Sequence, residues 1–220
     1  MKPVILFDVN ETLLDLAALD PVFEAVFGDA GARQAWFGQV LQSALVLTVL
    51  ERYEDFSTVA GHALTQLAQR RGIELGADDR ARVAEGMKRL PCHPDVPAAL
   101  RRLADAGFRM AALTNSPPAV ADAQLRHAGL ADSLEAILTV EIAGRLKPHQ
   151  SVYTSAARAL DVPIGDTLMV AAHGWDIAGA MNAGCRGAFI ARPGQVPDTL
   201  FPAPDYVVQD LGGLADQLIR

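Results

Sequence analysis

The sequence predicts an α/β fold in which a mainly parallel sheet forms the core and an all-helical cap is inserted into it. Short unbroken apolar runs, typical of strands buried on both faces, occur at residues 4–7, 109–113, 136–140, 167–172 and 187–191. Segments with helical periodicity, several of them closed by glycine, lie between these runs at residues 96–106, 119–128, 151–160 and 177–183. A longer stretch, residues 16–90, has helical periodicity throughout.

The order of these segments divides the chain into two parts. Strands that alternate with helices at this spacing form βαβ units, which build a parallel sheet. Residues 1–15 and 91–220 are therefore expected to form the core, and residues 16–90 the cap. Two prolines within residues 91–94 mark the second boundary, and Asp95 is expected to cap the helix that follows.

The amino-acid composition and net charge exclude several classes of protein. Of the 220 residues, 50% are hydrophobic and 20% are charged, which suits a well-filled core. The formal net charge of −7 disfavours nucleic acid as a partner, because that binding relies on lysine and arginine. We expect neither a membrane span, which needs ~20 apolar residues, nor a secretory signal, and therefore a cytoplasmic protein. Cys92 and Cys185 lack the spacing of a metal site or disulfide framework and are expected to pack.

The most apolar stretch, residues 40–50, is expected on a cap helix. It carries more unbroken hydrophobicity than one core-facing stripe requires. The excess predicts that the protein forms a homodimer.

Polar residues follow four of the predicted strands. In an open α/β sheet, ligands bind beyond the carboxyl ends of the strands. The residues at these ends are Asp8, the pair Thr114 and Asn115, Lys147 and Asp176. Two carboxylates, a lysine and a hydroxyl–amide pair that converge from separate strands predict a site for a small anionic substrate, with an aspartate as nucleophile.

The same strand ends carry four motifs that resemble those of the haloacid dehalogenase superfamily. Residues 7–15 resemble the first motif, residues 113–115 the second, Lys147 with Pro148 the third, and Asp176 the acidic fourth. Four motifs in order over almost the full chain are a specific signal. Residues 52–56, 152–153 and 170–176 further resemble type II L-2-haloacid dehalogenases. The resemblance implies a Rossmann-like core with a helical cap, and hydrolytic dehalogenation of small 2-haloacids without a cofactor.

The resemblance implies a role for each matching residue. Asp8, kept ionised by Lys147, would attack the halogen-bearing carbon and form an ester that water then cleaves. Tyr153 would hydrogen-bond near both of them. Asp176 and His173 are placed to hold or activate the hydrolytic water.

Other matching residues would bind the substrate. Thr12 and Thr114 are expected to bind the substrate carboxylate, together with backbone N–H groups. Asn115 and Phe56 resemble the residues that surround the departing halide. Two aromatic residues, expected mainly to pack, complete the substrate-binding candidates: Phe37 and Trp175.

Two regions depart from the dehalogenase pattern. The cap arginine that binds halide and substrate in those enzymes falls at Phe37, which donates no hydrogen bond. Arg33, four residues earlier and on the same helix face, is expected to substitute for it by reaching into the site. Ala171 and His173 stand where the dehalogenases carry serine and asparagine. Because histidine titrates near neutral pH, the water-activating step or the substrate is expected to differ.

Asn10 is the third departure and defines the alternatives. Superfamily phosphatases place an aspartic acid two residues after the nucleophile, where it protonates the leaving group, and an amide has no such proton. A Mg²⁺-dependent phosphatase, with Mg²⁺ held by Asp8, Asn10 and Asp176, therefore ranks second. For that alternative, Asn10→Asp is expected to raise phosphatase activity. A non-catalytic binding protein ranks third, because Asp8, Lys147 and Asp176 are all intact.

Overall fold

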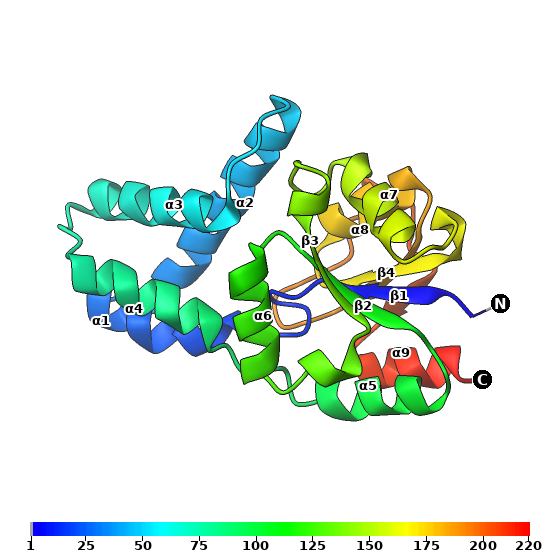
Figure 1. Ribbon diagram of the computed structural model, residues 1–220. Helices are drawn as coiled ribbons and strands as arrows, with labels where there is room; N and C mark the ends of the chain where they lie inside the picture. The colour runs from blue at the N-terminus through cyan, green and yellow to red at the C-terminus, as the bar shows by residue number, and fades with distance from the viewer. Residues whose placement is uncertain (1) are drawn as a thin grey trace.

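The computed structural model describes residues 2–220, in which a six-stranded, wholly parallel sheet forms the core (Figure 1). The strand order is β3-β2-β1-β4-β5-β6. The strands are β1 (Val4–Phe7), β2 (Met110–Thr114), β3 (Ala136–Thr139), β4 (Thr167–Ala171), β5 (Arg186–Ile190) and β6 (Tyr206–Val208). This arrangement confirms the fold class predicted from the sequence.

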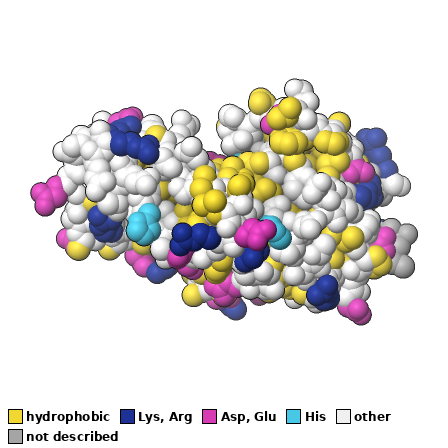
Figure 2. Space-filling model, turned by 90° about the horizontal axis from the view of Figure 1, so that it is seen from above, with side chains coloured by type: hydrophobic (Ala, Val, Ile, Leu, Met, Phe, Trp, Pro, Cys, Tyr) yellow, Lys and Arg dark blue, Asp and Glu magenta, His cyan; other side chains and the backbone are white. Residues whose placement is uncertain are grey.

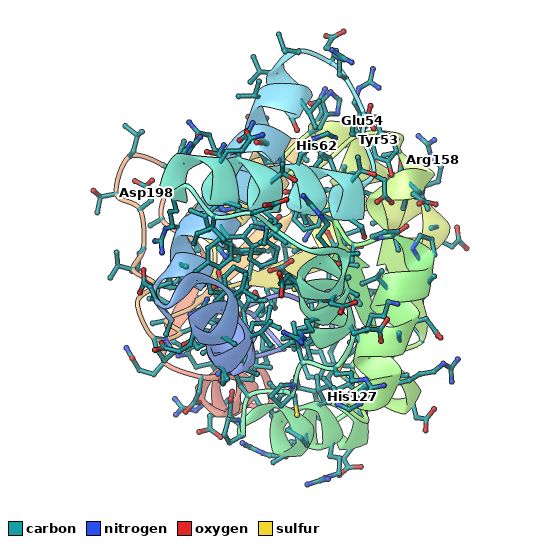
Figure 3. All side chains as sticks on the ribbon, turned by 90° about the vertical axis from the view of Figure 1, so that its left-hand side faces the viewer. Tyr53, Glu54, His62, His127, Arg158 and Asp198 are labelled. Atoms are coloured by element: carbon teal, nitrogen blue, oxygen red, sulfur yellow. The ribbon has the colours of Figure 1, made fainter. Side chains whose placement is uncertain are left out.

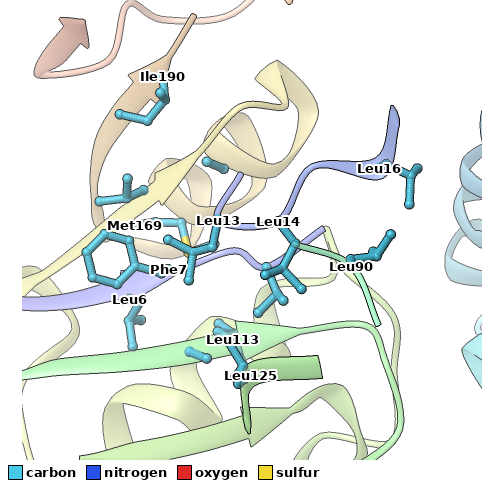
Figure 4. Packing of buried hydrophobic residues seen from close by; sticks show 14 of the residues in the cluster. Leu6, Phe7, Leu13, Leu14, Leu16, Leu90, Leu113, Leu125, Met169 and Ile190 are labelled. Atoms are coloured by element: carbon cyan, nitrogen blue, oxygen red, sulfur yellow. The ribbon is translucent and has the colours of Figure 1, made fainter. Parts of the chain in front are cut away.

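The first strand lies in the middle of the sheet, with a paired strand on each side, and both of its faces are covered. All four of its residues are buried, and Phe7 is paired with Ala112 of β2 on one side and Val170 of β4 on the other. The apolar side chains of Leu6, Phe7 and Met169 pack together near this strand (Figure 4). The carboxylate of Asp8 is therefore positioned by a buried, central strand of the sheet.

Helices cover the two faces of the sheet. In Figure 1, α5 and α9 lie below it and α7 and α8 lie above it, while α6 packs against β3. The core helices are α5 (Val96–Asp105), α6 (Pro118–His127), α7 (Gln150–Ala159), α8 (Gly174–Ala183) and α9 (Leu211–Leu218). Short 3-10 turns are η1 (Leu16–Leu19), η2 (Ala131–Ser133), η3 (Val140–Ile142) and η4 (Ile164–Asp166).

Four further helices lie beyond the carboxyl ends of the strands, on the left of Figure 1. They are α1 (Asp20–Phe27), α2 (Ala32–Val49), α3 (Phe56–Arg71) and α4 (Ala77–Lys88). Helix α3 begins where the Asp55 carboxylate accepts hydrogen bonds from two backbone N–H groups, and it ends at Gly72, whose φ of 66° suits glycine. Trp36 of α2 packs against Phe23 of α1 with the rings tilted, and it donates a hydrogen bond to the Ala60 carbonyl at 2.9 Å, which joins three of these helices.

The boundary before α5 differs from the expectation. Asp95 lies at the N-cap position, but its side chain makes no capping hydrogen bond. Its carboxylate instead accepts hydrogen bonds from Arg192 Nη1 at 2.7 Å and from the backbone N–H of Leu211 at 2.8 Å. Asp95 therefore ties the start of α5 to the start of α9, and the prediction that its side chain caps α5 is wrong.

The apolar stretch of residues 40–50 lies at the end of α2. Val46, Val49 and Leu50 are exposed there. Figure 2 views the molecule from above, the side on which this end of α2 lies in Figure 1. Hydrophobic side chains gather near the middle of that face. Among residues 2–220, no helix combines the length and the hydropathy that crossing a membrane requires.

Candidate active site

Asp8 follows directly on the end of β1 and is anchored from several sides. Its backbone N–H donates a hydrogen bond to the Val170 carbonyl of β4 at 3.0 Å. One carboxylate oxygen, Oδ2, accepts a hydrogen bond from Thr12 Oγ1 at 2.7 Å, and the other lies 3.2 Å from Lys147 Nζ. The residue is only 7% exposed, so its charge depends on these partners rather than on water.

The ammonium group of Lys147 lies between two carboxylates. Its Nζ is 3.2 Å from Asp8 Oδ1 and 2.8 Å from Asp176 Oδ2. The second oxygen of Asp176 accepts a hydrogen bond from the Tyr153 hydroxyl at 2.6 Å. The backbone N–H of Lys147 donates to Asn115 Oδ1 at 3.0 Å, which fixes the start of the lysine side chain. The loop after β3 and helices α7 and α8 thus meet at the end of β1.

The charges of this cluster stabilise one another. Burial alone would raise the pKa of Asp8, but the positive charge of Lys147, with His173 and Thr12, holds that pKa well below its usual value. Burial alone would lower the pKa of Lys147, but the charges of Asp176 and Asp8 raise it above its usual value. Asp8 is therefore an anion and Lys147 a cation at neutral pH.

A glycine in α8 allows this close packing. A Cβ atom at Gly179 would lie 2.4 Å from Pro148 Cβ and 3.0 Å from the Tyr153 hydroxyl. Real Cβ atoms do not approach other atoms so closely. Glycine at this position therefore lets α8 approach the Lys147–Pro148 segment and brings Asp176 within reach of the ammonium.

His173 connects Asp8 with a second acidic residue. Its Nδ1 is 3.5 Å from Asp8 Oδ2, and its Nε2 is 2.8 Å from Glu11 Oε2. Burial alone would lower the pKa of His173, but hydrogen bonds and charges from Asp8 and Glu11 raise the pKa to about 9. The ring is therefore an imidazolium at neutral pH, held between two carboxylates.

Glu11 was not predicted as a site residue. Its φ of 62° lies in the left-handed region, which non-glycine residues occupy rarely, often at functional sites. The sequence alone does not indicate this conformation, which accompanies the approach of the carboxylate to His173.

The structure contradicts the expectation that Arg33 reaches into the site. Arg33 is buried, forms an ion pair with Asp20 and lies 3.6 Å from Glu11 Oε1. It is absent from the described residues that line the small cavity beside Asp8. Arg33 therefore contacts the site through Glu11.

The small cavity beside Asp8 has a volume of about 20 Å³. Its lining combines residues of the strand ends with aromatic and apolar side chains: Asp8, Asn10, Phe37, Leu41, Phe56, Thr114, Asn115, His173 and Trp175. The Trp175 indole stacks on His173, with ring centroids 5.4 Å apart. We refer to this space as the reaction cavity.

Several predicted site residues lie behind the reaction cavity. Thr12 donates to Asp8 and accepts a hydrogen bond from the backbone N–H of Ala172 at 3.0 Å, and it is completely buried. Its hydroxyl is thus committed to protein groups, which contradicts the expectation that it binds the substrate carboxylate. Tyr153 and Asp176 are also completely buried, and their hydrogen bonds join them to Lys147. Thr12, Tyr153 and Asp176 therefore surround and support the cluster.

Asn10 is held by Ser116, one of the polar residues that follow β2, and by Gln124, which the sequence analysis did not identify. Its Nδ2 donates a hydrogen bond to Ser116 Oγ at 3.2 Å, and its Oδ1 accepts one from Gln124 Nε2 at 3.0 Å. All three side chains are buried. The amide of Asn10 joins the turn after β1 to the end of β2 and to α6.

A larger polar chamber, of about 830 Å³, adjoins the reaction cavity. The two spaces share the side chains of Phe37, Leu41, His173 and Trp175. Glu11, Arg33 and Arg192 are among the charged residues that line the chamber.

Within residues 2–220, no group of three or more histidine, cysteine, aspartate or glutamate side chains is arranged to hold a metal ion. His62 and His127 are examples of histidines that lie apart from one another on the surface (Figure 3).

Comparisons with known proteins agree with this geometry. An (S)-2-haloacid dehalogenase of Pseudomonas sp. (strain YL) is 29% identical over 96% of this chain and 92% of its own length. The structure of the L-2-haloacid dehalogenase of Xanthobacter autotrophicus with chloropropionic acid covalently bound superposes with a TM-score of 0.92, at 28% identity, over 99% of this chain and 98% of that one. A phosphoserine phosphatase of Thermus thermophilus is 28% identical over 94% of this chain and 96% of its own length.

A family model for haloacid dehalogenase-like hydrolases matches residues 2–184. With the strand order, the buried Asp8–Lys147–Asp176 cluster and these relatives, the match shows that the chain belongs to the haloacid dehalogenase-like hydrolases.

Proposed function

We propose that the protein hydrolyses small 2-haloacids to 2-hydroxy acids through an ester on Asp8. The observation that carries this proposal is the position of the Lys147 ammonium between the carboxylates of Asp8 and Asp176. A carboxylate held as a buried anion is a nucleophile that is ready to react. The dehalogenase relatives support the choice of substrate class.

In the first step, a carboxylate oxygen of Asp8 attacks the carbon that carries the halogen. A carbon–oxygen bond forms, and the halide leaves with the electron pair of the carbon–halogen bond. Thr114 is proposed to bind the substrate carboxylate, and Asn115 and Phe56 to surround the halide, because all three line the reaction cavity. Lys147 keeps Asp8 ionised until attack and does not itself react.

In the second step, water attacks the ester carbonyl of Asp8 and the bond between that carbon and the alkoxide oxygen breaks. The alkoxide takes the second proton of the attacking water and leaves as the 2-hydroxy acid, and the Asp8 carboxylate is restored. Ester formation removes the negative charge of Asp8, which is one of the two charges that raise the pKa of His173. The pKa of His173 therefore falls when the ester forms, and the imidazolium loses a proton to solvent. The neutral ring then accepts a proton from the attacking water, while Glu11 orients the ring. The charge of Asp8 thus decides when His173 acts as a base.

The residues fit a bound metal ion poorly. Mg²⁺ would need oxygen ligands from Asp8, Asn10 and Asp176, but the Lys147 ammonium lies between the two carboxylates. These contacts support metal-independent chemistry and place a Mg²⁺-dependent phosphatase second.

Replacing the nucleophile tests the ester mechanism. We expect wild-type protein to release halide from 2-chloropropionate in the presence of EDTA, and Asp8→Asn to release none, because an amide oxygen is a weak nucleophile. Halide is measured with an ion-selective electrode. Asp78→Asn, an exposed aspartate in the first turn of α4, is the matched control and should keep wild-type activity. Loss of wild-type halide release in EDTA, restored by Mg²⁺, would contradict the proposal.

Replacing His173 separates the two steps. We expect His173→Gln to form the ester and to hydrolyse it slowly, because the variant lacks the base for the second step. A burst of halide equal to the enzyme concentration should then be followed by slow turnover. Intact-protein mass spectrometry should show the added acid without its halogen. Wild-type steady-state turnover in this variant would show that His173 is not the base.

The raised pKa of His173 predicts a pH dependence of stability. A group whose pKa rises from 6.5 in the unfolded chain to about 9 in the folded one stabilises the fold fully below pH 6.5 and loses that effect as pH rises through 9. The free energy of unfolding should therefore fall by about 3 kcal/mol over this range. Urea unfolding at pH 6 and pH 9.5 measures the fall. His173→Gln should lack most of it, whereas His127→Gln, an exposed histidine on α6, should keep it.

The exposed apolar end of α2 supports the proposal that the protein is a homodimer. Val46, Val49 and Leu50 are 51%, 82% and 59% exposed, and burying them against a second copy would remove apolar surface from water. Light scattering should give twice the chain mass, and Val49→Glu should shift the protein towards monomer. A monomer at micromolar concentration would remove the proposal. The cytoplasmic location stays a prediction.

A further inference from the structure

An apolar cleft lies among the cap helices α2, α3 and α4, beside the start of the core helix α6. It has a volume of about 330 Å³ and adjoins Trp36 and Phe37 of α2. The remaining lining is mostly apolar and includes Val40, Leu64, Val83, Met87 and Val120. Ser57, Gly61 and Ala84 are exposed, so the cleft opens to solvent, whereas Phe37 and Phe56 are buried at its inner side. The mechanism above makes no use of this space.

The cleft adjoins the reaction cavity. Phe37 and Phe56 line both spaces, so these two rings form a shared wall. The reaction cavity has a volume of only about 20 Å³, little more than the space of one water molecule. A substrate with a longer chain must therefore extend into a neighbouring space, and the cleft is the apolar one.

The polar groups around the cleft already have partners. Arg80 Nη1 donates to Thr65 Oγ1 at 2.7 Å, and Lys88 Nζ is 2.7 Å from Glu85 Oε1. The indole N–H of Trp36 donates to a backbone carbonyl. The cleft therefore offers an occupant mainly apolar contact, unlike the polar chamber on the other side of the reaction cavity.

We propose that the cleft binds the apolar chain of 2-halo acids longer than propionate, while the carboxylate and halogen lie beside Asp8. The inference rests on the proposed function for the reacting end of the substrate. The chain extends past Phe37 and Phe56, the two rings that line both spaces, into the cleft. A volume near 300 Å³ is at the lower end of the range for small-molecule sites, which suits a chain of several carbons.

Two glycines allow a matched test. Gly61 lines the cleft and Gly38 lines the polar chamber, and a Cβ atom at either position meets nothing within 4 Å. Both lie within helices, so Gly61→Leu and Gly38→Leu each add a side chain in open space without disturbing the packing. The measured quantity is the ratio of kcat/KM for 2-bromooctanoate to kcat/KM for 2-bromopropionate.

We expect Gly61→Leu to lower this ratio at least about tenfold, because each methylene that loses its apolar contact reduces the preference about fourfold. Gly38→Leu should change the ratio less than about twofold. An unchanged ratio in Gly61→Leu, or a fall confined to Gly38→Leu, would overturn the proposal.

Binding of octanoate, measured by titration calorimetry, separates the cleft from the chemistry. Octanoate has no halogen, so its binding is measurable whether or not the protein dehalogenates. We expect binding to wild type and to Gly38→Leu, and at least tenfold weaker binding to Gly61→Leu. Equal affinity for wild type and Gly61→Leu, or no binding to wild type, overturns the cleft proposal. Failure of halide release from both bromoacids, with octanoate binding retained, instead overturns the dehalogenase proposal alone.

Discussion

The buried ammonium of Lys147 is the constraint on which the rest of the site depends. Removing a charge from water is costly unless opposite charges and hydrogen bonds surround it. Asp8 and Asp176 supply the charges, and the fold must bring the end of β1, the loop after β3 and the start of α8 together to do so. A parallel sheet does this naturally, because the carboxyl ends of its strands share one edge.

The cluster continues outwards as a chain of alternating charges. Each group contacts one of opposite sign, from the interior of the core to the surface of the cap: Asp176, Lys147, Asp8, His173, Glu11, Arg33 and Asp20. Neighbours in such a chain polarise one another, so a change of charge at one member alters the next. Arg33 and Asp20 extend the chain into the cap helices, whereas the preceding members belong to the core.

The sequence identified those parts of the site whose position follows from the sheet. Asp8, Lys147 and Asp176 follow apolar runs, and strand ends meet at one edge. Glu11 was missed because its approach to His173 accompanies a left-handed backbone conformation, which its residue type does not signal. Gln124 was missed because its contact depends on how α6 packs.

The strands and helices show the same contrast: those with a clear local sequence pattern were predicted, and those that depend on tertiary contacts were not. Five strands were predicted within a residue or two, because each is a continuous apolar run. The sixth, β6, has three residues, and α9 contains two glycines, so local propensity barely distinguishes either from a loop. Both are stabilised by tertiary contacts, such as the hydrogen bond from Leu211 to Asp95.

The two hydrogen bonds of the Asn10 side chain affect how many residues separate this protein from a phosphatase. After Asn10→Asp, Gln124 and the Ser116 hydroxyl would both donate to the new carboxylate, and two donors favour its ionised form. An ionised group has no proton for a leaving alkoxide. The single exchange that distinguishes the two motifs is therefore insufficient by itself. A path between the two activities must also change Ser116, which follows β2, or Gln124 on α6.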